Sequence, residues 1–431
     1  MSTPMPPAEP APPVPTVALQ EPTRRVNGLF LGTLALANLG IMLAFYTPIQ
    51  NLLPRMSEEI SGADGKEFAL AVVTGVGVLG SVVGNPLAGA LSDRTTSRFG
   101  RRRPWLLGGA IVGAIAVSLL TLQSTVLGLA ITWLFAQVSV NSAYAALTAT
   151  IPDQVPVNQR GVASGWVGLA QTLGIVLGVA LVSFVVTGLA AGHYLTSALL
   201  LLLVLPFLAV LKDPVLPRED REPFHLGRFV KGFWVSPRLY PDFAWAWGAR
   251  FLVQLGSAIA TLYLLFFLKD RIGLDDTAAQ QNQTILIGLY AFGTMATAVV
   301  GGYFSDRSGR RKIFVIEATV VMAVAAVILA FTTTIGPAFV AALILGLGYG
   351  WYLAVDQALI TQVLPAARDR ARDLGVINIA NSAPQVLAPV IALAALTVFG
   401  RDDFGYPALY IVTAIVTLLG AVAIVPIKSV P

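Results

Sequence analysis

The chain has 431 residues; 56% of them are hydrophobic, 12% are charged, and the formal net charge is +5. Soluble domains are about 45–50% apolar and about 25% charged, so this composition excludes a soluble globular protein and a disordered one. With no Cys and only two His residues, the chain offers no disulfide or thiol chemistry and almost nothing from which to build a histidine metal site. What remains is a membrane protein with many spans and no expected cofactor.

Residues 1–23 form a Pro-rich tail that we expect to be disordered. It contains eight prolines and lacks the basic start and apolar core of a signal peptide. Apolar stretches follow that are long enough to span a bilayer as helices, which takes about 20 residues each. Unbroken runs of this length exclude a membrane barrel of short alternating strands and predict an all-α membrane protein. The twelve predicted transmembrane helices are 28–49, 68–91, 104–122, 126–151, 161–187, 195–211, 243–268, 283–304, 313–331, 335–364, 374–399 and 406–425.

Lys and Arg residues are distributed unevenly between the two sides of these spans. With the N-terminus inside, 22 of the 28 basic residues lie in cytoplasmic segments, five lie outside, and Arg250 lies within a span. Cytoplasmic loops of membrane proteins carry such an excess. The sequence therefore predicts a multi-pass protein of the cell membrane with both termini in the cytoplasm.

The break at 212–242 divides the spans into two sets of six. It combines prolines with mixed charges, and its Phe224, Phe229, Phe233 and Trp234 lie among basic residues, which is typical of a short helix on the membrane surface. We expect an N-terminal half at 24–211, a cytoplasmic linker at 212–242, a C-terminal half at 243–425 and a cytoplasmic tail at 426–431.

The two halves contain matching residues at a nearly constant offset. Asp93 and Asp306, each preceded by Ser, are 213 positions apart, and Gln171 and Gln385 are 214 apart. The triplet at 38–40 likewise matches the one at 254–256. This pattern predicts two pseudo-symmetric six-helix copies, an architecture of transporters whose solute site lies between the copies near the bilayer midplane.

Carboxylates and arginines gather in the predicted cytoplasmic loops. A carboxylate at a helix end can hold guanidiniums by charge-assisted hydrogen bonds, and such a contact can form in one conformation and break in another. The alternatives are that the arginines only fix topology and that Asp153 only caps a helix start. The residues of this predicted cytoplasmic gate are Asp93, Arg94, Arg101, Arg102, Asp153, Arg160, Asp306, Arg307, Arg310 and Arg311.

The stretch Gly89-Ala90-Leu91-Ser92-Asp93-Arg94 with its trailing basic residues, repeated from Gly302, resembles the signature loop of the major facilitator superfamily. Residues 92–104, with Thr47-Pro48 upstream, are similar to the same stretches of plant sucrose–proton symporters and their animal and bacterial relatives. The resemblance implies a transporter of a sugar, a disaccharide or glycoside, that works by alternating access with a proton or another coupling ion. It also puts Gln137 where the plant symporters carry an acid, which argues against proton coupling by that route.

Arg250 and Asp356 are charges inside predicted spans seven and ten. A charge within a span is costly and is by default a functional hypothesis. At 1.5 Å per residue, both lie roughly 10–13 Å from the cytoplasmic side, so we expect them to face one cavity and to pair. Asp356, with Arg250, is the predicted coupling or solute-orienting element; a structural ion pair is the alternative.

Polar residues recur at helical spacing in several spans, so each set lies on one helix face. Lipid offers no hydrogen-bond partners, so these faces must point into the bundle, where amides, hydroxyls and rings would suit a sugar. Hydrogen bonding between helices is the alternative. The predicted solute-cavity residues are Asn38, Gln137, Asn141, Tyr144, Gln171, Arg250, Gln254, Tyr352, Asp356, Asn378, Asn381 and Gln385.

The motif Gly75-x-Gly77-x-x-Gly80 matches a dinucleotide fingerprint, but it lies inside an apolar span, where it indicates close helix packing. The arginine-rich loops lack stacking aromatics in quantity, so no nucleic-acid partner is expected. The expected partners are a small solute, a coupling ion and the lipid bilayer, and the expected state is a monomer. Export of drugs or other small molecules is an alternative function, and a membrane sensor or enzyme without transport is another.

Overall fold

The computed structural model describes residues 21–221, 223–231, 236–308, 310–363, 370–400 and 404–428. The secondary-structure elements in these ranges are helices joined by short loops. The N-terminal half comprises α1 (Gly28–Thr47), α2 (Leu53–Asp93), α3 (Arg103–Leu119), α4 (Val126–Gln154), α5 (Val157–Ala180) and α6 (Leu189–Val210). The short helix α7 (Leu226–Lys231) lies in the predicted linker. The C-terminal half comprises α8 (Pro241–Leu262), α9 (Leu264–Asp270), α10 (Asp276–Ser308), α11 (Arg311–Phe331), α12 (Ile335–Val363), α13 (Arg370–Phe399) and α14 (Gly405–Ile424).

The helix count agrees with twelve spans. Among the described residues, nine helical segments are long and apolar enough to cross a membrane, or ten when α8 and α9 are taken as one bent span. One of the nine runs from Gly28 to Asp93 and contains both α1 and α2. Counting α1 and α2 separately, taking α8 with α9 as one span and adding α10, which is long enough but less apolar, gives one helix for every predicted span.

Two junctions differ from the predicted pattern. The prediction leaves 50–67 between spans, but a π-helical turn at Pro48–Leu52 leads directly into α2, which bends at Gly62, where φ is +69°. Residues with a Cβ rarely adopt that left-handed conformation. Span seven bends by 42° between α8 and α9 at Tyr263, a buried residue whose hydroxyl donates to the carbonyl of Glu67 at 3.1 Å. Neither Pro nor Gly marks this second bend, so the sequence carries no signal for it.

The same packing order occurs in both halves. Helix α1 packs against α5 and α6 as α8 does against α13 and α14, and α2 packs against α4 as α10 does against α12. Glycines bring the last two pairs close together. A Cβ added at Gly77 would lie 2.3 Å from the Trp133 ring, and one at Gly346 would lie 2.2 Å from the Tyr290 carbonyl oxygen. The glycines in the middle of α2 therefore act in helix packing, as small residues do in membrane proteins.

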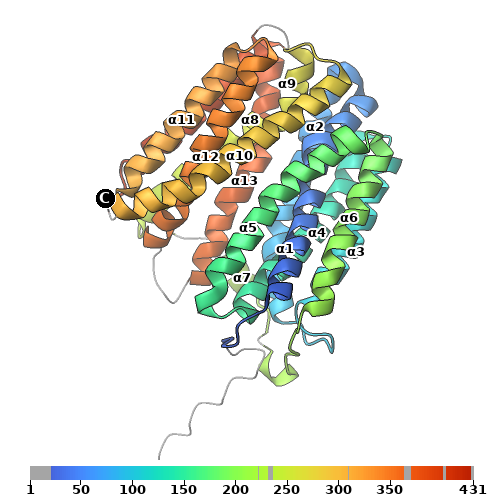
Figure 1. Ribbon diagram of the computed structural model, residues 1–431, viewed down its shortest axis with the longest axis vertical. Helices are drawn as coiled ribbons and strands as arrows, with labels where there is room; N and C mark the ends of the chain where they lie inside the picture. Colours follow the sequence, from blue (N-terminus) through green and yellow to red (C-terminus); the bar gives the residue numbers. More distant parts are fainter. Residues whose placement is uncertain are drawn as a thin grey trace, which may run out of the picture.

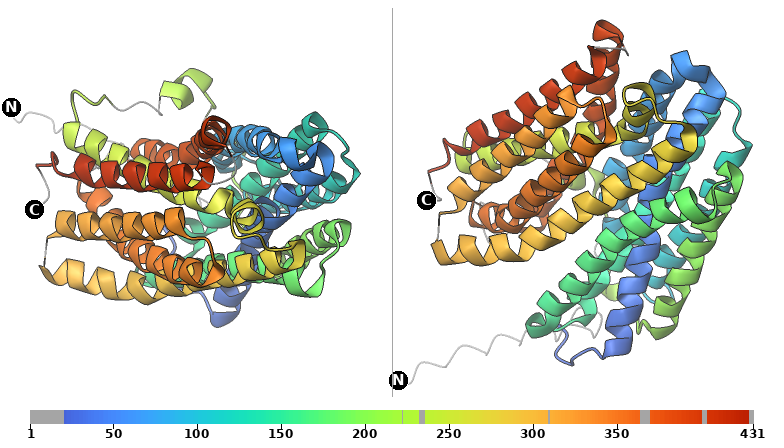
Figure 2. Two further views of the ribbon diagram at one scale, coloured as in Figure 1. Left: turned by 90° about the horizontal axis from the view of Figure 1, so that it is seen from above. Right: turned by 45° about the horizontal axis from the view of Figure 1, so that its top comes forward.

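The two halves are inclined to one another (Figures 1 and 2). We call the end with the 94–102 loop and residues 212–221 at the start of the linker the arginine-rich end, and the end with residues 53–67 and 263–275 the far end. The halves contact each other through α2 with α13 and through α5 with α10. Figure 1 shows the bundles close together near α9 and α2, with α11 and α12 on one outer side and α3 and α6 on the other.

Candidate functional site

The C-terminal half contains a buried ion pair between α8 and α12. Arg250 Nη1 lies 3.1 Å from Asp356 Oδ2, and each side chain is 5% exposed. The pairing expected from the sequence is therefore present. It forms because both charges lie at similar depth in helices that pack together, and because neither could be buried in this position alone without a large desolvation cost.

Further polar side chains surround this pair. Arg250 Nε donates to Asn381 Oδ1 at 2.8 Å, and the Tyr352 hydroxyl donates to Asp356 Oδ1 at 2.9 Å. One turn along α8, Gln254 Oε1 accepts from the Tyr349 hydroxyl at 3.0 Å. Three helices, α8, α12 and α13, thus join four of the predicted cavity residues in one connected group, and a fifth, Gln254, lies one turn away.

This group is not saturated with hydrogen bonds. The Arg250–Asp356 contact has the distance of an ion pair without the alignment of a hydrogen bond, and neither Nη1 nor Oδ2 has an aligned partner among the described residues. A buried donor or acceptor without a partner costs about 1–3 kcal/mol, and more when it is charged. The buried pair therefore retains unused hydrogen-bonding capacity, with one donor and one acceptor side by side.

The predicted cavity residues of the N-terminal half bond mainly within that half. Asn141 Nδ2 donates to Gln137 Oε1 at 3.0 Å, and Asn38 Nδ2 donates to the carbonyl of Val167, which links α1 to α5. The ring of Tyr144 packs edge-on against Phe45 at 6.3 Å. For Asn38 this geometry favours the alternative that the sequence left open, hydrogen bonding between helices.

Three predicted cavity residues remain. Gln171 is half-buried on α5, and Gln385 is exposed on α13. The side chain of Asn378 lies outside the described residues.

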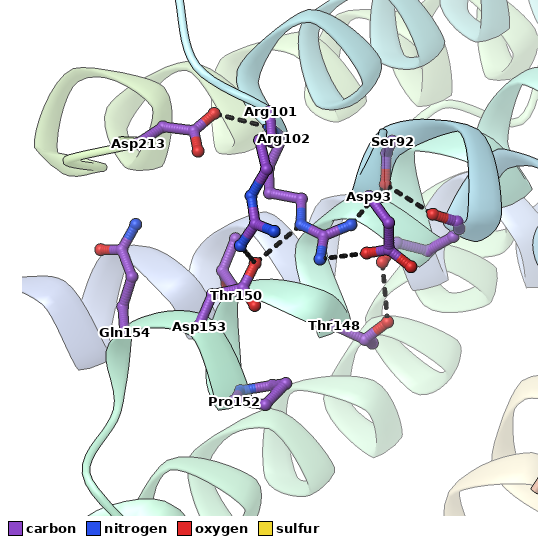
Figure 3. A network of polar contacts seen from close by, with 12 residues as sticks. Ser92, Asp93, Arg101, Arg102, Thr148, Thr150, Pro152, Asp153, Gln154 and Asp213 are labelled. Atoms are coloured by element: carbon purple, nitrogen blue, oxygen red, sulfur yellow. Dashed lines mark hydrogen bonds and ion pairs between the residues drawn. The ribbon is translucent and has the colours of Figure 1, made fainter. Parts of the chain in front are cut away.

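Arg102 is the centre of a polar network at the arginine-rich end, which we call the Arg102 network (Figure 3). Its Nε donates to Asp153 Oδ2 at 2.8 Å and its Nη2 contacts Asp93 Oδ1 at 2.5 Å, while Arg101 Nη2 reaches the same Asp153 oxygen at 3.1 Å. Burial alone would lower the pKa of Arg102, but the carboxylates of Asp153 and Asp93 outweigh it and raise the pKa. The network joins the adjacent ends of α2, α3 and α4.

Asp213, which the sequence did not single out, completes this network from the linker. Its Oδ2 accepts from the backbone N–H groups of Arg102 and Arg103 at 2.6 and 2.8 Å (Figure 3). A carboxylate at the start of α3 satisfies donors that have no partner within the helix and interacts favourably with the helix dipole. The only sequence signal was an acid directly after a span, where basic residues are expected.

The remaining predicted gate residues are arranged differently. Asp153 belongs to the Arg102 network, but Arg160 does not join it and contacts the carbonyls of Val155 and Pro152. Arg94 Nη1 donates to the carbonyl of Ala90 at 2.7 Å. In the second repeat, Arg307 and Arg310 are exposed and Arg311 is half-buried, while the side chain of Asp306 lies outside the described residues.

At the far end, the two halves are joined by ion pairs that the sequence analysis did not anticipate. Lys66 Nζ of α2 lies 2.6 Å from Asp270 Oδ1 of α9, and Lys269 contacts Glu58 of α2. Lys269 also lies 2.7 Å from Asp276 Oδ1, and the hydrogen bond from Lys269 lowers the pKa of Asp276. The two pairs that join the halves, Lys66–Asp270 and Lys269–Glu58, link residues 204 and 211 positions apart, so no local pattern could pair them.

Long helices in two inclined halves, with a buried ion pair inside one half, define a multi-pass membrane protein built from a duplicated six-helix unit. The family model described as the Major Facilitator Superfamily matches residues 28–281 and 246–431. The chain belongs to that superfamily.

Known proteins resemble the chain over different lengths. The general alpha-glucoside permease of Schizosaccharomyces pombe is 29% identical over 168 residues, which are 35% of this chain and 30% of the permease. An uncharacterized symporter of Synechocystis is 50% identical over 40 residues, which are 9% of this chain and 7% of the symporter. The matches thus span less than a third of either relative.

A solved structure shares the fold over nearly the whole chain. The crystal structure of a point mutant of the nucleoside transporter NupG superimposes with a TM-score of 0.72 at 16% identity, and the match covers 93% of this chain and 100% of that one. At this identity the likeness establishes the fold and leaves the solute to be argued from the site.

Proposed function

We propose that the protein is a secondary transporter of a small hydroxyl-rich solute, a disaccharide or glycoside, and that it works by alternating access between its two halves. The observation that carries this proposal is the buried pair of Arg250 Nη1 and Asp356 Oδ2, each without an aligned hydrogen-bond partner among the described residues. Adjacent sugar hydroxyls can donate to the carboxylate and accept from the guanidinium. The partial match to an alpha-glucoside permease supports the same solute class.

The aromatic side chains near the pair also suit a sugar ring. Tyr349 lies 6.1 Å from Tyr352 and 5.7 Å from Tyr290, measured between ring centroids. Pockets for polar ligands combine apolar and aromatic walls with a few placed polar groups. Here the walls would be tyrosines of α10 and α12, and the polar groups would be Arg250, Asp356 and Asn381.

Asp356 is the proposed coupling residue. Protonation of its carboxylate removes the negative charge that balances Arg250, so the proton and the ion pair compete for the same oxygens. Intramembrane acids that pair with a cation are typical of proton pathways. Gln137, at the position where related symporters carry an acid, cannot take this role.

The way in which the two halves are joined supports alternating access. The polar contacts between the halves, such as Lys66 with Asp270, gather at the far end, while the Arg102 network joins helices of one half at the arginine-rich end. This arrangement suits a conformation that is closed at the far end. The charge bias supports a cytoplasmic arginine-rich end and hence cytoplasmic termini. We also propose that the protein is a monomer of the cell membrane.

The test is uptake of labelled maltose and sucrose into proteoliposomes, with and without an imposed proton gradient. We expect gradient-driven accumulation that Asp356→Asn abolishes and that Glu219→Gln, which removes an exposed linker carboxylate, leaves intact. Uptake that only equilibrates would refute coupling but keep the solute class. Uptake blocked by lipophilic cations but not by sugars would refute the solute class in favour of drug export.

A further inference from the structure

Glu317 is an exposed carboxylate on the outer face of α11. This helix is the most apolar of the candidate spans among the described residues, and it lies on the outer side of the C-terminal half, away from the N-terminal half (Figure 1). The other exposed positions that share its face at helical spacing are all apolar: Ile313, Val320, Val324, Val327 and Phe331. Such a face is covered by lipid acyl chains, so Glu317 lies in a lipid-facing surface.

The structure shows no cation beside this carboxylate in the part of the chain that it describes. Side chains three and four positions away are the neighbours on a helix surface. At Glu317 all four of these neighbours are apolar: Ile313, Phe314, Val320 and Val321. Lys312 is the next basic residue along α11, but its Nζ donates to the carbonyl of Ile427. Glu317 itself has neither a hydrogen bond nor an ion pair within the described ranges, which leaves the balancing cation to a molecule beside α11.

The carboxylate lies near the membrane surface at the start of α11. Glu317 follows Arg311, the first residue of the helix, by six positions, which puts its Cα roughly 9 Å into the span at about 1.5 Å per residue. Helical side chains point back towards the helix N-terminus, so this one reaches towards the surface. Long polar side chains near the ends of spans place their polar groups at the membrane interface in this way. The carboxylate is thus at the depth where lipid headgroups begin.

We propose that Glu317 binds the ammonium headgroup of an aminophospholipid, whose acyl chains cover the apolar face of α11. A primary ammonium offers three N–H donors to a carboxylate, and such charge-assisted hydrogen bonds are strongest where water is scarce. The acyl chains of the same molecule match the exposed Val320, Val324 and Val327. Phosphatidylcholine has the positive charge but no N–H donor, and phosphatidylglycerol has only a negative charge. The site would therefore select phosphatidylethanolamine, whatever solute the protein carries.

A second copy of the chain is the other partner that could cover this face. It would have to bring a basic side chain into an apolar interface and desolvate both charges, which is costly unless further hydrogen bonds satisfy them. A lipid ammonium already lies at this depth and stays partly hydrated. The lipid is therefore the occupant that we test, with self-association as the competing outcome.

The experiment uses the full-length protein purified in detergent and incubated with equal amounts of phosphatidylethanolamine, phosphatidylcholine and phosphatidylglycerol. Native mass spectrometry measures how much of each lipid is retained and whether the protein is a monomer. Glu317→Gln removes the charge and keeps the shape of the side chain, and Glu317→Lys reverses the charge. The matched control is Glu219→Gln, which removes an exposed carboxylate of the linker. Thermal unfolding in lipid-free detergent controls for folding.

We expect the wild type and Glu219→Gln to retain phosphatidylethanolamine about five-fold or more over phosphatidylcholine, as for one charge-assisted hydrogen bond. Glu317→Gln should lose this preference while unfolding at the wild-type temperature, and Glu317→Lys should prefer phosphatidylglycerol.

The proposal is overturned if the wild type does not distinguish phosphatidylethanolamine from phosphatidylcholine, or if Glu317→Gln keeps the preference. A dimer that Glu317→Gln dissociates would overturn it in favour of self-association. A lower unfolding temperature of Glu317→Gln in lipid-free detergent would overturn it too, because Glu317 would then act through contacts within the chain.

Discussion

Arg250 contacts both Asp356 of α12 and Asn381 of α13. Arg250 Nη1 lies 3.1 Å from Asp356 Oδ2, and its Nε donates to Asn381 Oδ1 at 2.8 Å, so one guanidinium bridges α8, α12 and α13. Solute binding at this guanidinium would therefore act on three helices of the same half at once.

Neutralising one member of this pair should destabilise the protein. Removing one partner of a buried ion pair leaves an uncompensated charge and costs about 3–5 kcal/mol. We expect Arg250 to be left unbalanced in Asp356→Asn, which should unfold at a lower temperature than the wild type in detergent. The double variant Arg250→Gln with Asp356→Asn should recover part of the loss while remaining inactive in uptake. An unchanged unfolding temperature for Asp356→Asn would contradict this account.

Asn381 should affect solute affinity more than stability. Its Oδ1 holds Arg250 Nε, and the loss of a hydrogen bond to a charged group costs about 1.5–3 kcal/mol. We expect Asn381→Ala to raise the KM for uptake about ten-fold or more with a smaller change in maximal rate. The matched control is Thr397→Ala on the same helix, whose exposed hydroxyl bonds only to its own helix backbone. Equal KM values for the two variants would refute the prediction.

Arg102 should not tolerate replacement by another cation. Its guanidinium contacts Asp153, Asp93 and Ser92 in different directions, which the single ammonium of a lysine cannot reproduce. We expect Arg102→Lys to slow uptake and lower the unfolding temperature. Arg98→Lys, an exposed arginine of the same loop, should do neither. Wild-type uptake by Arg102→Lys would mean that charge alone suffices at this position.

The far-end ion pairs should hold the two halves together. Lys66 is almost fully buried and lies 2.6 Å from Asp270, so Lys66→Met keeps the aliphatic stem but removes the ion pair. Spin labels at Tyr194→Cys and Phe404→Cys, both exposed positions at the far end in opposite halves, would report the separation, and the chain has no native Cys to interfere. We expect longer distances in Lys66→Met. An unchanged distance distribution would assign the closure to apolar packing.

The same labels can test pH dependence. The hydrogen bond from Lys269 lowers the folded-state pKa of Asp276, so its stabilisation is fully present above the ordinary Asp pKa of about 3.9 and is lost as the pH falls through the lowered value. In an Asp356→Asn background, where the proposed coupling acid cannot titrate, the label distance should stay constant between about pH 8 and pH 5. Widening within that range would show that another group controls the far end.

The sequence could predict the Arg250–Asp356 pair because a charge inside an apolar span is rare and its depth follows from the helical rise. Helical spacing is a weaker guide for Gln385, because Pro384 directly precedes it inside α13 and a proline removes a helix hydrogen bond and disturbs the regular helix on which the spacing argument depends.

Local sequence patterns could not predict contacts between segments that are far apart in the chain. The sequence indicates only that Lys66 and Lys269 lie on the same side of the membrane. Their partners, Asp270 and Glu58, are identified only by the packing of the two halves against each other. Asp213 was missed for a related reason: its partners are backbone N–H groups of a loop about 110 positions earlier, and a backbone partner leaves no signature in the side-chain sequence.

The close glycine contacts between α2 and α4 and between α10 and α12 hold each of these helix pairs together as a rigid unit. Any bulk added at Gly77 or Gly346 would collide with the neighbouring helix, so these helices cannot slide past each other without strain. Movement of one half against the other would then be concentrated at the contacts of α2 with α13 and of α5 with α10. A molecule bound at these contacts would hold the two halves in place without touching the Arg250–Asp356 pair, which makes this surface a target for an inhibitor.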